Sequence, residues 1–195
     1  MERGRGRNHA FQKARGQPDY ETKIIPKLSY AVAKAIDSYI AAKFNEFSQI
    51  VGAEGVKVTW EVLLAAKAYL DLADAPEDDR FLIIDPATLQ DLMQEELFTS
   101  TLYGANDAVS KGWIGQQKVL NCKVFMTNNL EAINTNYHGA AMFQREALAA
   151  AVPDGGVRIE TWEEKARHTT FHRASAWYGA VEVRDTLGVW IKTRA

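Results

Sequence analysis

The sequence predicts an α+β protein in which a long helix precedes a body of short strands and helices. Three patterns predict this class. An apolar stripe with helical spacing runs through residues 33–47, four consecutive apolar residues typical of a covered strand stand at 81–84, and two short apolar strands follow one another within 180–192.

Length and composition allow one sizeable core or two small ones. The chain has 195 residues, of which 47% are apolar and 25% charged, as in ordinary globular proteins. Its single cysteine, Cys122, excludes an intrachain disulfide framework and fits a reducing compartment. No apolar stretch approaches the ~20 residues that span a bilayer, and no secretory signal is recognisable, so we expect no membrane association and synthesis in the cytoplasm.

The first 28 residues predict an irregular basic arm. Residues 1–27 hold seven Lys or Arg against three Asp or Glu, a charge of +4, and because the whole chain carries −2, the other 168 residues carry −6. Glycines together with Pro18 and Pro26 disfavour helix in the arm. A segment of this composition buries too little apolar surface to order itself, so we expect it to need a partner.

Helical periodicity begins at Ser29. The apolar stripe of this helix, which we expect to continue to about Val51, consists of Ala33, Ile36, Ile40, Phe44 and Phe47. Glycines end the helix shortly afterwards. Thr59 is then a plausible N-cap for a second amphipathic helix that extends through Leu70.

The middle of the chain combines strands, a helix and a loop. Phe81–Ile84 predicts a strand covered on both faces. Asp85-Pro86 is a strong helix start, because the carboxylate caps the helix and proline's missing N–H costs nothing at the first helical position. Leu89, Leu92 and Met93 are expected to form the buried face of that helix. Residues 99–116 predict a glycine-rich loop, and Lys123–Met126 predicts another strand.

The last third of the chain is predicted to contain both helices and strands. Residues 139–151 have the highest helix propensity in the chain and predict a helix. Residues 157–162 alternate apolar and polar side chains, which predicts a half-buried strand. A further helix is expected at 170–177, and two strands at 180–184 and 188–192.

The ionisable residues do not form a catalytic or metal-binding set. His168 and His172 lie four apart, but Thr169 stands where a zinc-protease motif needs glutamate, and flanking arginines would repel a cation. Cys122 with His138 lacks an orienting third group. We therefore expect no enzymatic activity, no cofactor and no metal. The alternative class, a small α+β hydrolase or transferase, would need a concave site with perturbed ionisable groups.

The order of the elements resembles the major capsid proteins of tailed bacteriophages, the family of the Hong Kong 97 shell fold. The resemblance covers roughly Ser29 to Lys192. It rests on short segments that occur in a fixed order: Phe81–Ile84 with Asp85-Pro86, Gly112–Gly115, Val124–Leu130, Ala141–Leu148, and Trp177–Arg184 with Gly188–Lys192.

The resemblance implies a Hong Kong 97 type capsid fold with a long spine helix at Ser29–Val51, a peripheral sheet and an axial domain. The domain boundaries expected from it are an N-terminal arm at 1–28, a peripheral domain from 29–58 and 152–195, and an axial domain at 59–151. The family also has an extended hairpin, the E-loop, ahead of the spine helix. Because only 28 residues precede that helix here, the E-loop is expected to be short or absent from this chain.

The same resemblance implies the function of a virion shell protein. Such a protein self-assembles through pentamers and hexamers into an icosahedral phage head that encloses double-stranded DNA, with scaffolding and portal proteins as further partners. An encapsulin-like compartment on the same fold, which encloses cargo enzymes instead of DNA, is the alternative that these residues leave open.

Two groups of residues are candidate contact sites. Arg3, Arg5 and Arg7 form a flexible cation cluster that could bind DNA phosphates non-specifically or an acidic surface of a scaffolding protein, although a solvated tail is the plainer interpretation. By analogy with the family, the 99–116 loop lies near the ring axis and meets its own copies. Its candidate contact residues are Tyr103, Asn106, Lys111 and Trp113.

Overall fold

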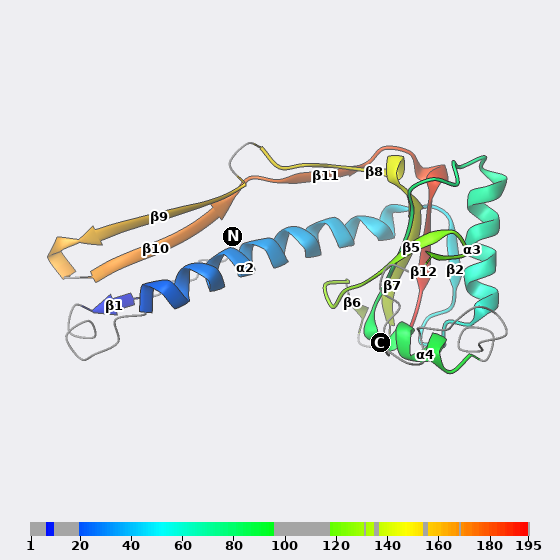
Figure 1. Ribbon diagram of the computed structural model, residues 1–195, viewed down its shortest axis with the longest axis horizontal. Coiled ribbons are helices and arrows are strands. Elements are labelled where there is room, and N and C mark those ends of the chain that lie inside the picture. The colour runs from blue at the N-terminus through cyan, green and yellow to red at the C-terminus, as the bar shows by residue number, and fades with distance from the viewer. Residues whose placement is uncertain are drawn as a thin grey trace. The chain divides into compact units, whose positions relative to one another are not determined.

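The chain folds into two compact units, each built from segments distant in sequence (Figure 1). One unit joins Met1–Asp37 to Ala150–Gly179, and the other joins Ser38–Ala149 to Ala180–Ala195. The computed structural model describes residues 7–9, 20–95, 118–130, 132–134, 137–153, 156–167 and 169–194. We call the unit that contains Met1–Asp37 the hairpin unit and the unit that contains Ser38–Ala149 the sheet unit.

The hairpin unit consists of a long helix and a narrow sheet. Helix α2 (Tyr20–Ala41) has 22 residues, of which the last few belong to the sheet unit. Strands β9 (Val157–Glu164) and β10 (Thr169–Ala176) pair antiparallel over their full length, from Glu164 opposite Thr169 to Val157 opposite Ala176, with a short 3-10 turn η4 (Lys165–Arg167) before β10. Strand β1 (Arg7–His9) adds to the other edge of β10.

The sheet unit is organised around a mixed seven-stranded sheet in the order β2-β12-β7-β3-β5-β4, with β6 paired to β7 off this path. The pairs β12/β2 and β3/β5 are parallel and the others antiparallel. The strand bounds are β2 Ile50–Gly52, β3 Arg80–Ile84, β4 Lys118–Val119, β5 Cys122–Met126, β6 Ala132–Asn134, β7 Tyr137–Gln144 and β12 Gly188–Lys192.

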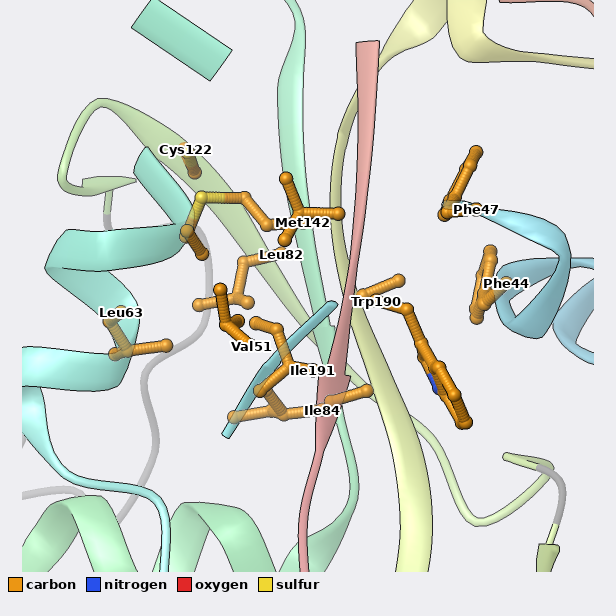
Figure 2. Close-up of a cluster of buried hydrophobic side chains, with 14 of the residues drawn as sticks. Phe44, Phe47, Val51, Leu63, Leu82, Ile84, Cys122, Met142, Trp190 and Ile191 are labelled. Atoms are coloured by element: carbon orange, nitrogen blue, oxygen red, sulfur yellow. The ribbon is translucent and has the colours of Figure 1, made fainter. Parts of the chain in front are cut away.

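A helix covers one face of this sheet, and a short 3-10 turn covers part of the other. Because successive side chains of a strand point to opposite faces, Leu82 and Met142 share the face on which Leu63 of helix α3 (Trp60–Leu72) packs. On the other face, Phe44 and Phe47, from the 3-10 turn η1 (Ala42–Glu46) and the residue after it, pack near Trp190 (Figure 2). These side chains form the core.

A two-stranded ribbon, a short helix and two 3-10 turns complete the described elements. A two-stranded ribbon pairs β8 with β11, and two short 3-10 turns flank it. The bounds are α4 Pro86–Met93, η3 Arg145–Ala147, β8 Leu148–Ala151, β11 Gly179–Glu182 and η5 Asp185–Leu187.

Several local predictions are confirmed. Helix α4 begins at Pro86, and the Asp85 carboxylate accepts a hydrogen bond from the Thr88 amide at 3.1 Å, as an N-cap should. Thr59 is the N-cap residue of α3, although its side chain makes no capping hydrogen bond. The predicted strands at 81–84, 123–126, 157–162, 180–184 and 188–192 are present as β3, β5, β9, β11 and β12.

Two predicted helices are wrong, because tertiary packing overrides helix propensity there. Residues 139–151 form strand β7, the turn η3 and strand β8. Strand β7 lies between β12 and β3, where Ala140 and Ala141 are fully buried and Ala141 is paired on both sides. The expected helix at 170–177 is strand β10, whose eight residues pair with β9.

The long helix is also displaced from its predicted bounds. It begins at Tyr20 rather than Ser29 and includes Pro26, so the last part of the predicted irregular arm is helical. It ends at Ala41, where η1 turns Phe44 onto the sheet. The contact-defined units also place 180–195 with the sheet unit, whereas the prediction grouped 152–195 together. The names peripheral and axial stay a prediction.

Candidate assembly surfaces

The contact residues predicted from sequence lie mostly outside the described part of the chain. This holds for Arg3 and Arg5, and for all four loop residues, Tyr103, Asn106, Lys111 and Trp113. Arg7 lies in β1, where its backbone pairs opposite Phe171. Both proposed contact sites therefore stay predictions, and the candidate surfaces below come from residues that the structure describes.

The first surface is the outer face of helix α3. Leu63, Ala66 and Leu70 are fully buried against the sheet. Leu64 and Leu72 point away from it, and Leu72 is 83% exposed. Apolar side chains that stay exposed in line along a helix are suited to contact with a partner. We call Leu64, Ala68 and Leu72, which follow one another at steps of four residues, the α3 face.

A buried guanidinium fixes α3 relative to the sheet. Arg80, at the start of β3, is 2% exposed, and its side chain donates to the Asp71 carboxylate and the Ala75 carbonyl, both at 2.6 Å, and to the Pro76 carbonyl at 2.9 Å. Hydrogen bonds from Lys67, which has the larger effect, and from Arg80 hold the pKa of the Asp71 carboxyl below its usual range. The last turn of α3 and the loop after it are thereby tied to the central strand.

The second surface is a row of aromatic rings on the opposite face of the sheet. Phe44 lies 5.4 Å from Phe143, Phe143 lies 5.9 Å from Phe81, and Phe81 lies 6.0 Å from Phe125 (ring centroids). The row starts at the buried Phe44 and ends at Phe125, which is 53% exposed on strand β5. We call Phe81, Ile83 and Phe125 the open end of the aromatic row. In the described chain η1 covers only its other end.

Two lysines lie over aromatic rings of the sheet unit, one of them in the aromatic row. Lys123 Nζ lies 5.4 Å from the centre of the Phe81 ring, and Lys192 Nζ lies 5.2 Å from the Trp190 ring. Each ammonium also pairs with an acidic residue of its own chain, Asp79 at 2.7 Å and Glu54 at 2.9 Å respectively. Such exposed ion pairs contribute little to stability, so they can be exchanged for contacts with a partner.

A third surface lies in the hairpin unit. Trp162 of β9 stacks on Phe171 of β10, with ring centroids 5.4 Å apart and planes at 16°. Trp162 is nevertheless 46% exposed, and Trp177, just after β10, is 82% exposed. Aromatic residues are the type most enriched in protein interfaces. A long ribbon with few buried side chains of its own therefore also offers contact area to another molecule.

The residues that were considered as catalytic candidates do not lie in the surroundings that catalysis would need. Cys122 is buried in β5, and burial raises the pKa of its thiol to about 11, which makes it a poor nucleophile. His172 lies in strand β10 rather than on a helix, and its Nδ1 is 3.0 Å from the Thr161 hydroxyl. Its predicted companion His168 is outside the described residues.

A small open cavity of about 290 Å³ lies where β3 and β5 end, lined by residues that include Asp85, Thr127, Asn128 and His138. The Asp85 carboxylate is already used in capping α4 and lies 3.4 Å from His138 Nδ1. Among the described residues, no three His, Cys, Asp or Glu side chains are grouped so that they could hold a metal ion. Across the same residues, no helix is both long and apolar enough to cross a membrane.

Comparisons with known proteins give a clear answer for the fold. No protein-family model matches the chain, and no curated protein sequence matches it either. Solved structures do. The capsid structure of the cyanophage P-SCSP1u superposes with a TM-score of 0.82 at 16% identity, over 97% of this chain and 71% of that one. A structure from Mycobacterium phage Che8 gives 0.78 at 18% identity, over 96% and 68%. A virus-like particle from Pyrococcus furiosus gives 0.51 at 15% identity, over 82% and 63%.

The chain therefore has the Hong Kong 97 type capsid fold, which is the fold that the sequence resemblance predicted. The likeness extends over nearly the whole chain. The α3 face and the aromatic row were not found by sequence reasoning. A signal for α3 existed, because Leu64, Ala68 and Leu72 lie off the stripe formed by Leu63, Ala66 and Leu70. The aromatic row, by contrast, joins Phe44, Phe81, Phe125 and Phe143 only in three dimensions.

Proposed function

We propose that this chain is the major capsid protein of a tailed bacteriophage. In this role it self-assembles through pentamers and hexamers into an icosahedral head that encloses double-stranded DNA. The observation that carries the proposal is the superposition of 97% of the chain on a phage capsid structure. The exposed apolar surfaces support it, because a subunit that works only in an assembly leaves such surfaces uncovered when it is alone.

The role is structural rather than catalytic. Shell contacts need broad area more than a pocket, and permanent assemblies bury on the order of 2,000 Å² or more per interface. The candidate nucleophile, Cys122, is buried with a raised thiol pKa, and the buried Asp85 carboxylate serves as a helix cap. Scaffolding and portal proteins are the further partners expected in this role, and the virion is the expected location.

Negative-stain microscopy of the purified chain, alone and mixed with candidate scaffolding protein from the same genome, tests the proposal. We expect uniform shells, or rings of five and six subunits. A species that stays monomeric under every condition would contradict it.

Deleting residues 1–15 tests the role of the arm. We expect this deletion to change assembly, or to change the amount of DNA that particles retain and the dependence of that amount on salt. Unchanged assembly and unchanged DNA retention would remove the arm's role.

An encapsulin-like compartment is the second candidate. The likeness to the Pyrococcus furiosus virus-like particle favours it, although that superposition has the lower TM-score of 0.51 and covers 82% of this chain. The contents of particles isolated from infected or expressing cells separate the two functions. Nuclease-protected double-stranded DNA of genome length supports a phage head, whereas particles that contain protein cargo and no such DNA support a compartment.

A further inference from the structure

The two apolar surfaces of the sheet unit lie on opposite sides of the same sheet. The α3 face looks outward from the helix that packs on Leu82 and Met142. The open end of the aromatic row belongs to the alternate residues of the same strands, Phe81, Ile83 and Phe125, which point the other way. Within one copy of the sheet unit the two surfaces cannot meet, because the sheet separates them. They can meet only between copies.

We propose that the α3 face of one copy docks onto the open end of the aromatic row of the next copy. This inference rests on the proposed shell function and names the surfaces through which neighbouring subunits join. An interface between two different surfaces of identical subunits is heterologous, and it generates a ring where the rotation closes. Rings of five and six subunits need an interface of this kind.

Charge favours this pairing over the pairing of the α3 face with itself. Acidic residues predominate around the α3 face. Glu61 lies in the first turn of the helix, and Asp74, Glu77 and Asp78 lie in the exposed loop after it, whereas Lys67 on the helix pairs with Asp71 at 2.5 Å. At the open end of the aromatic row, Lys123 lies over the Phe81 ring, and its ammonium pairs with Asp79 of the same chain. Two α3 faces would bring acidic borders together, whereas in the mixed contact Lys123 can exchange Asp79 for a carboxylate of the neighbouring copy.

The shapes of the two surfaces also differ in a complementary way. The α3 face is a convex ridge with Leu72 as its most exposed apolar side chain, at 83%. The aromatic row is a sheet face whose rings are already held by neighbouring rings, with Phe81 between Phe125 and Phe143. Rigid aromatic side chains lose little conformational entropy on binding, so they are suited to receive a leucine ridge.

Pairs of introduced cysteines test which surfaces meet. Leu72→Cys and Phe125→Cys are made as single variants and as a double variant, and each protein is treated with a short bis-maleimide crosslinker. The native Cys122 is buried with a thiol pKa of about 11, so it should not compete, and the wild type serves as the check. Val56→Cys, an exposed residue of the same unit outside both surfaces, replaces Leu72→Cys in the matched control.

Three results are expected. Neither single variant crosslinks to itself, a mixture of the two single variants gives crosslinked dimers, and the double variant gives a ladder that stops at five or six subunits. Crosslinking of the mixture should exceed that of the Val56→Cys and Phe125→Cys mixture by about tenfold or more. Phe125→Ser and Leu72→Ser should each raise the concentration required for assembly by about tenfold, the effect of losing one well-packed contact, while Val56→Ser should not.

The opposite results separate this inference from the proposed function. If wild-type particles form but the mixture crosslinks no more than the control, or if a single variant crosslinks to itself, the pairing is wrong while the shell function stands. If the wild type forms no particles or rings, the proposed function fails. Because both replaced side chains are exposed, thermal unfolding of the variants should match the wild type, and this measurement confirms that assembly rather than folding is affected.

Discussion

The packing of Gly188 against Phe47 gives a quantitative test of how the sheet unit is built. Gly188 is the first residue of β12 and is buried, and a Cβ atom placed on it would come closer than 3.0 Å to three atoms of the Phe47 ring. Its backbone is extended, with φ of −129°, so the objection to a larger residue is steric rather than conformational. Phe47 itself is 1% exposed and packs 6.4 Å from the Phe143 ring.

The expected free energies of unfolding follow from this geometry. Gly188→Ala should destabilise the protein by about 1–3 kcal/mol through overpacking. Phe47→Ala should cost about 3–5 kcal/mol, since it leaves a large cavity. In the double variant the new methyl group lies in that cavity, so the cost should stay at about 3–5 kcal/mol instead of reaching the sum. The coupling energy of the cycle is then about 1–3 kcal/mol.

Urea unfolding followed by tryptophan fluorescence measures this cycle on unassembled subunits, with light scattering to confirm that no particles are present. With a urea dependence of about 2 kcal/mol per M, the midpoint should fall by about 0.5–1.5 M for Gly188→Ala. Gly179→Ala is the matched control, because a Cβ there would meet no atom within 4 Å, and its effect should stay within about 0.5 kcal/mol. Strict additivity of the two substitutions, or an unchanged midpoint for Gly188→Ala, would refute the reasoning.

Three further predictions concern single groups of the sheet unit. Asp85→Ala should lower the free energy of unfolding by about 0.5–2 kcal/mol, because the Thr88 amide loses its cap, and a thermal melt equal to the wild type would contradict this. Hydrogen bonds from the Ser48 hydroxyl and amide lower the pKa of the Asp185 carboxyl. They therefore stabilise the folded state at pH values above 3.8, the ordinary pKa of this carboxyl, and the stabilisation is lost as pH falls through the lowered pKa of the folded state. The stability difference between wild type and Ser48→Ala should therefore shrink as pH falls from 7 to below 3.8, and a difference that is independent of pH in this range would contradict the assignment. Cys122 should react slowly with a thiol reagent at pH 8 in the folded protein and rapidly in denaturant, whereas equal rates would show that the thiol is accessible.

Sequence patterns predicted those parts of the fold that depend on local chemistry. Asp85-Pro86 specifies a helix start by itself, since the cap and the proline act within one turn, and α4 begins there. The apolar run at 81–84 predicted a strand covered on both faces. The strand is present as β3 between β7 and β5, but it is fully covered only on the face toward α3. Its alternate residues are fully or nearly fully buried, while Phe81 and Ile83 are half-buried on the face that carries the aromatic row.

The errors arise where a distant segment decides the local structure. The alanine-rich segment after Gly139 has high helix propensity, but it forms strand β7, which pairs with β12. A Cβ at Gly139 would come closer than 3.0 Å to the Trp190 indole nitrogen, so the strand can pass the tryptophan only with a glycine there. Strand β12, which contains Trp190, lies some fifty residues further along the chain, and no sequence pattern near Gly139 predicts the pairing of β7 with β12.

The candidate surfaces could be predicted only in part, for the same reason. In α3, Leu64 and Leu72 lie off the buried stripe of the helix, so the sequence alone indicates a second set of apolar side chains there. The aromatic row was not predictable, because it joins residues of η1, β3, β5 and β7 across the sheet. The loop and arm residues chosen from sequence, including Trp113 and Arg5, stay predictions for the assembled protein.

Native mass spectrometry of the purified chain, recorded over a range of concentrations with and without a scaffolding protein, measures directly how many subunits associate. The shell proposal predicts complexes of five and six subunits and particles made from multiples of them. A chain that remains a monomer or a two-fold dimer at every concentration, with every candidate scaffolding partner, would contradict it.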